Sequence, residues 1–216
     1  MKVDIWSDVR CPFCYIGKRK FEAALADFDH KGEIEVEWHS FELDPNAVTI
    51  LDKTSEEYLA ERYGKSKEWA AETHKNVANA AAEVGLTFNF DQAIVANSFD
   101  AHRLIQLAKT KGLGDAIEEA MFKAHFTDGK NIDDQEALQK IGLSVGLDVS
   151  EIREMLNSDR FTDEVRYDEK TAETIGVRGV PFFVFNEKLA VSGAQPPETF
   201  LGALNQAWES RQSSAT

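Results

Sequence analysis

The stretch that decides the fold is VDIWSDVRCPFC, residues 3–14, in which the only two cysteines of the chain stand three positions apart behind an apolar run. Val3 to Ser7 predicts a short strand, and residues 8–10 predict a turn. A helix is expected from about residue 11 to residue 28, because its apolar positions recur at four- and seven-residue steps along one face. The cysteines Cys11 and Cys14 are therefore expected at a strand-to-helix junction.

This position of the two cysteines favours redox chemistry. Residues i and i+3 of a helix are neighbours, with Cβ atoms roughly 5–6 Å apart, so their sulfurs can join in a disulfide. Unpaired N–H groups and the helix dipole favour negative charge at a helix N-terminus, so we expect a stabilised thiolate at Cys11. Arg10 would add to that stabilisation and Asp8 would oppose it. Cys14 shares the apolar face with Phe21, which is typical of a shielded resolving thiol.

Other interpretations of the two cysteines are weaker. As inert small hydrophobes they would not need to be paired behind a strand. A zinc site normally needs four ligands, and the sequence offers no second close pair of cysteines or histidines, so we predict no metal. A structural disulfide between residues three apart would close too short a loop to constrain the unfolded chain. A non-catalytic module that uses the helical region to recruit a partner stays open as an alternative.

The rest of the chain predicts one sheet interrupted by helices. Residues 33–38 alternate charged and apolar side chains, which predicts an edge strand and completes a β-α-β unit. Residues 180–185 and 188–192 predict a hairpin about a turn at 186–187, and a last helix follows. We therefore predict an α/β fold in which residues 1–44 and 166–216 form one domain and residues 45–165 form a helical insertion domain.

The predicted insertion contains several sequence signals for the start of a helix. Thr54 with Glu57 fits a capping box, and Asp133 and Asp148 are each followed three residues later by glutamate. Helices are further predicted over residues 97–111 and from about residue 113 to residue 126, from apolar residues at i, i+3, i+4 and i+7.

Four segments carry a resemblance to a known family. They are CPFCYIGK at 11–18, AHRL at 101–104, FKAHFTDG at 122–129 and GVRGVPFF at 176–183. In this order they resemble recurring segments of the DsbA family, and specifically of its FrnE-like cytosolic branch. The resemblance implies a thioredoxin-like fold interrupted by a helical domain, which agrees with the order of elements predicted above.

The resemblance also implies a set of site residues. It implies that Val180-Pro181 is a cis bond facing Cys11, and that the backbone of Val180 hydrogen-bonds a bound peptide or thiol. It suggests that the insertion lines the substrate groove, which makes His125 a candidate for substrate binding. Pro12 and Phe13, between the cysteines, and Phe182 are expected to flank the site. For His125 the alternative is an interior histidine, and core packing explains Phe182 equally well.

One further histidine, His39, follows the second predicted strand. It could shuttle protons near the thiols, but a strand-end or surface histidine is the preferred interpretation.

The predicted function is thiol-disulfide exchange with protein, peptide or small-thiol substrates through Cys11 and Cys14, in a direction that the sequence leaves open. The alternative is a glutathione-dependent enzyme acting on small aromatic molecules, such as a 2-hydroxychromene-2-carboxylate isomerase or a kappa-class glutathione transferase. Those relatives usually carry serine at the first cysteine position and lack the second cysteine, whereas this chain keeps both. Glutathione is thus a possible co-substrate, and no other cofactor is predicted.

The composition of the chain limits which binding partners and which cellular compartment we expect. A formal net charge of −14 disfavours binding to nucleic acid and to anionic membranes. No segment has the roughly 18 consecutive apolar residues that span a bilayer. Residues 1–8 contain no basic stretch followed by an apolar region, so we expect no signal peptide and a cytoplasmic location.

Overall fold

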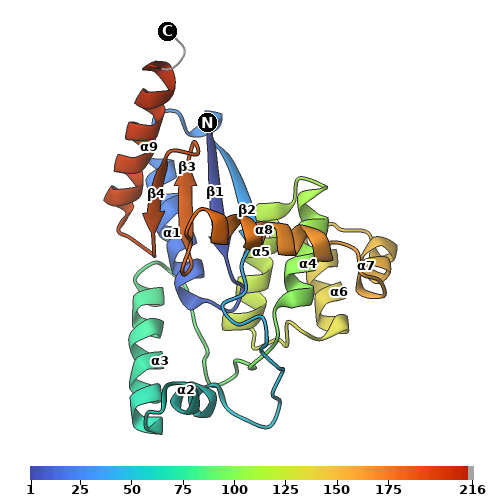
Figure 1. Ribbon diagram of the computed structural model, residues 1–216. Helices are drawn as coiled ribbons and strands as arrows, with labels where there is room; N and C mark the ends of the chain where they lie inside the picture. Colours follow the sequence, from blue (N-terminus) through green and yellow to red (C-terminus); the bar gives the residue numbers. More distant parts are fainter. Residues whose placement is uncertain (214–216) are drawn as a thin grey trace. The chain divides into compact units, whose positions relative to one another are not determined.

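The computed structural model describes residues 1–213, and it contains a four-stranded mixed sheet (Figure 1). The strands are β1 (Lys2–Ser7), β2 (Glu35–Ser40), β3 (Phe182–Phe185) and β4 (Leu189–Ser192), in the order β2-β1-β3-β4. Strand β1 pairs in parallel with β2 and antiparallel with β3, which pairs antiparallel with β4. Thus β2 lies at an edge, as the sequence predicted, but it begins two residues later because residues 31–33 form a 3-10 helix.

Helices fill the rest of the chain. They are α1 (Pro12–Ala26), α2 (Ser55–Tyr63), α3 (Lys67–Ala82), α4 (Phe99–Lys109), α5 (Gly114–Phe122), a π-helical segment (Lys123–Thr127), α6 (Gln135–Ser144), α7 (Val149–Leu156), α8 (Thr162–Thr174) and α9 (Pro197–Ser213). The fold is therefore a mixed α/β thioredoxin-like sheet whose α2–α8 are inserted between β2 and β3. None of the helices described is long and apolar enough to cross a membrane.

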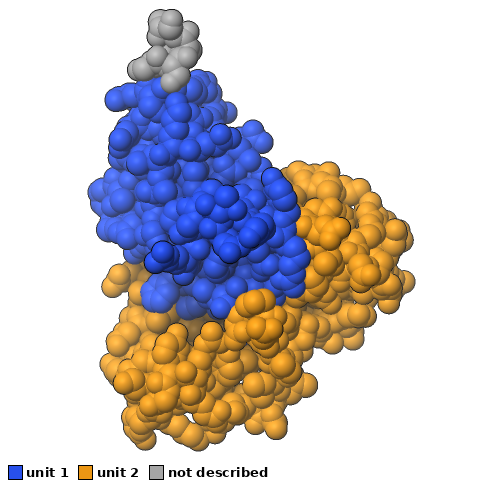
Figure 2. All heavy atoms as spheres, in the orientation of Figure 1, with its two compact units in different colours: residues 1–43, 165–216 blue, residues 44–164 orange. Residues whose placement is uncertain are grey.

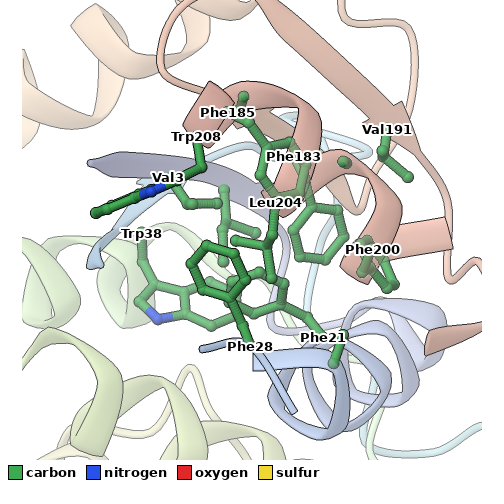
Figure 3. Packing of buried hydrophobic residues seen from close by; sticks show 14 residues of the cluster. Val3, Phe21, Phe28, Trp38, Phe183, Phe185, Val191, Phe200, Leu204 and Trp208 are labelled. Atoms are coloured by element: carbon green, nitrogen blue, oxygen red, sulfur yellow. The ribbon is translucent and has the colours of Figure 1, made fainter. Parts of the chain in front are cut away.

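The main core lies on the face of the sheet that α1 and α9 cover. Side chains alternate along a strand, so Val3 and Ile5 of β1 point to this face together with Phe183 and Phe185 of β3. Figure 3 shows Val3, Phe183 and Phe185 packed among aromatic residues of α1, of the turn that follows it and of α9: Phe21, Phe28, Phe200 and Trp208. This packing fixes α1, and with it the cysteine pair, against the strands.

The opposite face of the sheet packs against α8. The alternate residues Trp6 of β1 and Phe182 and Val184 of β3 lie there with Ala172 of α8. The Trp6 ring also donates its N–H to the carbonyl of Asp168, at 3.0 Å. The sheet therefore has helices on both faces, in the layered arrangement of an α/β fold.

The chain divides into two compact units, coloured separately in Figure 2: residues 1–43 with 165–216, and residues 44–164. In the second unit Thr54 and Glu57 form the predicted capping box on α2, and Asp148 caps α7. The predicted start at Asp133 is wrong by one residue. Asp134 accepts from the Ala137 N–H at 2.8 Å and caps α6, whereas the Asp133 carboxylate accepts from the Thr49 hydroxyl.

Candidate active site

Cys11 stands where β1 gives way to α1. It is the N-cap residue in extended backbone, and the helix begins at Pro12 rather than at Cys11 itself. Proline fits this first helical position because it lacks an N–H that would have no partner there. The Cys11 N–H donates to the Asp8 carbonyl at 2.9 Å, and the Cys14 N–H donates to the Cys11 carbonyl at 3.0 Å. These bonds hold both cysteines in the turn that opens the helix.

The segment before β3 lies against the first cysteine, although it is far away in sequence. The Cys11 thiol donates to the Val180 carbonyl at an Sγ to O distance of 3.5 Å. The peptide bond between Val180 and Pro181 is cis. The Pro181 carbonyl in turn accepts from the Gly193 N–H at 2.8 Å, which ties this segment to the end of β4. This contact places the Val180 carbonyl directly beside the Cys11 sulfur, and the role of the Val180 backbone in binding a substrate stays a prediction.

The two cysteines differ in accessibility. Cys11 keeps 5% of its surface exposed, whereas Cys14 has none. Burial raises the pKa of the Cys14 thiol, and the neighbouring Cys11 sulfur raises it further. The Asp8 N–H and the Ser7 hydroxyl lower the pKa of Cys14, but by less. Both cysteines are buried, but Cys11 keeps some exposed surface and Cys14 keeps none, so Cys11 is the better placed of the two to meet a substrate.

The end of β1 supplies two buried polar residues that the sequence did not single out for these roles. The Asp8 carboxylate is buried and accepts from the Arg10 N–H at 3.0 Å and from the Leu43 N–H at 2.9 Å. It therefore joins the cysteine turn to the chain after β2. The Ser7 hydroxyl is buried and lowers the pKa of Cys14, although it makes no hydrogen bond of standard geometry among the described residues.

Gly17, one turn further along α1, leaves room for the segment that contacts Cys11. A Cβ atom built on Gly17 would lie 2.9 Å from Cγ of Pro181 and 3.6 Å from Cα of Ala194. The first separation is shorter than Cβ atoms tolerate, so any side chain here would push the helix and the Pro181 segment apart. The motif that contains Gly17 was recognised in the sequence, but its partner could not be inferred locally.

The remaining predicted site residues lie in different places. Pro12 and Phe13 lie on the first turn of α1, and Phe13 is 47% exposed beside the cysteines. Phe182 begins β3 and packs on the α8 face. His125 lies in the helical unit, on the π-helical segment, with its ring 4.6 Å from that of Phe126. Its predicted role in substrate binding stays a prediction.

His39 is held in a hydrogen-bonded cluster on the α8 face. Its two ring nitrogens each lie 2.8 Å from a carboxylate oxygen, one of Asp4 and one of Asp168. The ring also stacks on Trp6 with centroids 4.5 Å apart. A neutral imidazole has only one N–H, so this geometry favours the doubly protonated ring. These contacts account for His39 as a structural residue.

The same cluster includes a set of side chains that could in principle hold a metal ion. Ligand atoms of Asp4, Glu37 and His39 lie within 4.8 Å of one another. Lys2 already forms ion pairs with both acids, however, with its Nζ 2.7 Å from Asp4 and 2.5 Å from Glu37. His39 uses both nitrogens as described, so we interpret the cluster as an ion-pair network.

The helical unit carries a groove of its own, of about 660 Å³, beside the π-helical segment and α6. Two of its three lysines, Lys123 and Lys140, form ion pairs with Asp128 and Glu136. His125 is not among the residues that line the groove. The groove therefore offers no support for the predicted role of His125.

The chain is similar to known proteins over nearly its whole length. The model of the DSBA-like thioredoxin domain matches residues 2–205. The uncharacterized protein YwbO of Bacillus subtilis is 29% identical over 205 residues, which cover 94% of this chain and 95% of that protein. A crystal structure of a probable DsbA oxidoreductase from Streptomyces coelicolor superposes with a TM-score of 0.92 at 41% identity, covering 97% of this chain and 90% of that one.

A more distant structure shares the fold alone. The cytosolic disulfide reductase DsbM of Pseudomonas aeruginosa, solved with GSH, superposes with a TM-score of 0.64 at 15% identity, covering 100% of this chain and 99% of that one.

Proposed function

Because the chain belongs to the DSBA-like thioredoxin domain family, we propose that it is a thiol-disulfide oxidoreductase that acts on protein or small-thiol substrates through Cys11 and Cys14. The observation that carries the proposal is the pair of cysteines at the N-terminus of α1, in which Cys11 keeps some exposed surface and lies 3.5 Å from the Val180 carbonyl, and Cys14 is fully buried. Within the family, the four sequence segments described above support a place in the FrnE-like branch.

The proposed reaction uses two exchanges. In the reductive direction the Cys11 thiol loses its proton, and the thiolate attacks one sulfur of a substrate disulfide. A Cys11–substrate disulfide forms, and the other substrate sulfur leaves as a thiolate. The Cys14 thiolate then attacks Sγ of Cys11, the Cys11–Cys14 disulfide forms, and the second substrate thiolate leaves. Two electrons have passed from the protein to the substrate, and the reverse sequence oxidises a substrate dithiol.

Trapping the intermediate tests this proposal. A Cys14→Ala variant cannot resolve the mixed disulfide, so we expect it to accumulate substrates bound covalently through Cys11. Non-reducing electrophoresis and mass spectrometry of the bound sulfur would detect them. A Cys11→Ala variant is the matched control, and it should trap none. If Cys14→Ala traps nothing and Cys11 is unreactive near neutral pH, the proposal is wrong.

The same variants separate the proposal from its alternatives. A glutathione-dependent isomerase or transferase would keep its turnover after loss of Cys14, because its chemistry needs no second thiol. A non-catalytic module would keep its cellular role when both cysteines are replaced. The reduction potential of the pair then gives the direction: a value near that of thioredoxin, about −270 mV, indicates a reductant, and one near that of DsbA, about −120 mV, an oxidant.

A further inference from the structure

Two of the nine arginines of the chain differ from the others. Seven direct their guanidinium groups to a carboxylate or an amide oxygen: Arg19 to Glu22, Arg62 to Asp44, Arg103 to Asp100, Arg153 to Gln139, Arg160 to Glu154, Arg166 to Glu42 and Arg211 to Glu33. Within residues 1–213, the guanidinium groups of Arg10 and Arg178 have neither a hydrogen bond nor an ion pair. Arginine side chains in this protein thus usually have a partner within the protein, and these two are left able to bind a ligand.

Both exceptions lie within two residues of a residue of the cysteine site. Arg10 directly precedes Cys11 and is half-buried. Arg178 is exposed and stands two residues before Val180, whose carbonyl contacts Cys11 Sγ at 3.5 Å. Consecutive Cα atoms are about 3.8 Å apart, so the Cα atom of Arg178 lies at most about 7.6 Å from that of Val180. Both positions are thus close enough for a long arginine side chain to reach a ligand bound at Cys11.

The acid nearest in sequence to each of these two arginines makes its hydrogen bonds or ion pairs with groups other than their guanidinium groups. The first turn of α1 contains no acidic residue. The buried Asp8 carboxylate is turned to the N–H groups of Arg10 and Leu43. Glu173, the acid that comes before Arg178 in α8, is paired with Lys170 at 2.5 Å. A chain of net charge −14 therefore carries two uncommitted positive groups next to its reactive thiol.

We propose that Arg10 and Arg178 bind the carboxylates of a small anionic thiol or disulfide that reacts with Cys11. This inference rests on the proposed function and names the substrate class of the same site. Guanidinium groups bind carboxylates through paired hydrogen bonds, which would orient the ligand as well as attract it. Glutathione, cysteine-like thiols and their disulfides belong to this class, since each carries carboxylates near its sulfur.

A small ligand fits this site better than an acidic protein does. Charges separated by more than about 8–10 Å are largely screened at physiological ionic strength. A small anion at Cys11 would therefore respond mainly to the two nearby arginines. An acidic protein would cover much more of a surface whose net charge repels it.

The reaction consists of the same two thiol-disulfide exchanges as in the proposed function. The substrate here is a disulfide in which each of the two joined thiols carries carboxylates. The Cys11 thiolate attacks one sulfur of the disulfide, and the other half leaves as a thiolate that keeps its own carboxylates. Attack by Cys14 on Sγ of Cys11 then releases the bound half. No further oxidant or reductant is needed, because the disulfide accepts the two electrons that the cysteines give up.

A series of disulfides that differ in charge tests the proposal. The reduced protein would be mixed separately with oxidised glutathione, the neutral 2-hydroxyethyl disulfide and the cationic cystamine, and the second-order rate constants measured from the loss of protein thiols. We expect Arg10→Gln and Arg178→Gln each to slow the reaction with oxidised glutathione about fivefold at low ionic strength, because an exposed ion pair contributes up to about that factor. The effect should shrink as salt is added.

The controls keep this test separate from that of the proposed function. Both variants should react with 2-hydroxyethyl disulfide as the wild type does, and with cystamine at least as fast. Lys31→Gln removes one positive charge in the 3-10 helix before β2, and should leave all three rates unchanged. Equal rates with oxidised glutathione for the wild type and both arginine variants would overturn the proposal, while reaction with the neutral disulfide would leave the proposed function standing. Arginine dependence confined to an acidic peptide disulfide would also overturn it.

Discussion

At the scale of single residues, the Ser7 hydroxyl explains how a fully buried Cys14 could become a nucleophile. Burial and the Cys11 sulfur raise the pKa of Cys14, so its thiolate is scarce at neutral pH. The Ser7 hydroxyl lowers this pKa, although in the described structure it makes no hydrogen bond of standard geometry. A thiolate accepts a stronger hydrogen bond than a thiol, so the hydroxyl would gain a partner when Cys14 ionises.

Replacing Ser7 by alanine should therefore slow resolution of the mixed disulfide. The pKa of Cys14 should rise further, and release of a substrate bound to Cys11 should slow on the order of tenfold near pH 7, from the loss of a hydrogen bond to a charged group. Rapid-quench measurement of release as a function of pH checks this, and the variant's profile should shift to higher pH.

A second buried serine provides the control for this prediction. The Ser98 hydroxyl is likewise buried and without a partner in the described structure, but it lies in the helical unit. Ser98→Ala should leave the pH profile of release unchanged. The proposed role of Ser7 would be refuted by a Ser7→Ala profile that coincides with the wild type.

At the scale of elements, the missing side chain at Gly17 sets how closely α1 approaches the segment before β3. Gly17→Ala would place a Cβ atom 2.9 Å from Pro181 Cγ, so the two elements must separate. We expect a loss of about 1–3 kcal/mol in the free energy of unfolding, less any gain in helix propensity, and slower reaction of Cys11. Urea denaturation and thiol kinetics measure the two effects.

Gly202 of α9 is the matched control for that substitution. A Cβ atom there would meet nothing within 4 Å, and the residue also lies inside a helix. Gly202→Ala should stabilise the protein by roughly 0.5–1 kcal/mol through helix propensity alone. If the two variants were equally stable, the close approach at Gly17 would have no energetic consequence.

The elements also show which features the sequence could predict. The strands, the hairpin, the capping box and the helix starts depend on residues that are neighbours in sequence. They were found within about two residues of their predicted positions. The π-helical segment at Lys123–Thr127 was missed, because its apolar spacing matches that of the α-helix expected there. The partners of Gly17 and His39 were missed for another reason: each contact joins residues that only the folded chain brings together.

At the scale of the whole molecule, the Asp4–His39–Asp168 cluster connects β1 and β2 to α8, and so joins the two chain segments of the first compact unit, residues 1–43 and 165–216. Burial opposes ionisation of Asp4, but hydrogen bonds from His39 and Lys2 outweigh this and lower the pKa of the carboxyl. A depressed carboxyl pKa stabilises the fold above the unfolded value of about 3.9. That contribution is lost as the pH falls through the lower pKa of the folded state.

An Asp4→Asn variant should remove this dependence on pH. We expect the wild type to be the more stable protein at neutral pH, and its advantage to shrink steadily once the pH drops below about 4. Denaturant unfolding of both proteins across this range gives the difference. A difference that stayed constant with pH would show that Asp4 contributes nothing through its charge.

The insertion between β2 and β3 also affects the order in which the molecule can form. Strand β1 ends at Ser7 and its partner β3 begins only at Phe182, so the centre of the sheet cannot close until nearly all of the chain exists. At about 5–20 residues per second, a ribosome needs roughly ten to thirty seconds to make that stretch. Val180 reaches Cys11 only after this delay. We therefore expect the newly synthesised chain to carry two ordinary thiols for most of its synthesis, and to acquire its distinctive sulfur chemistry last.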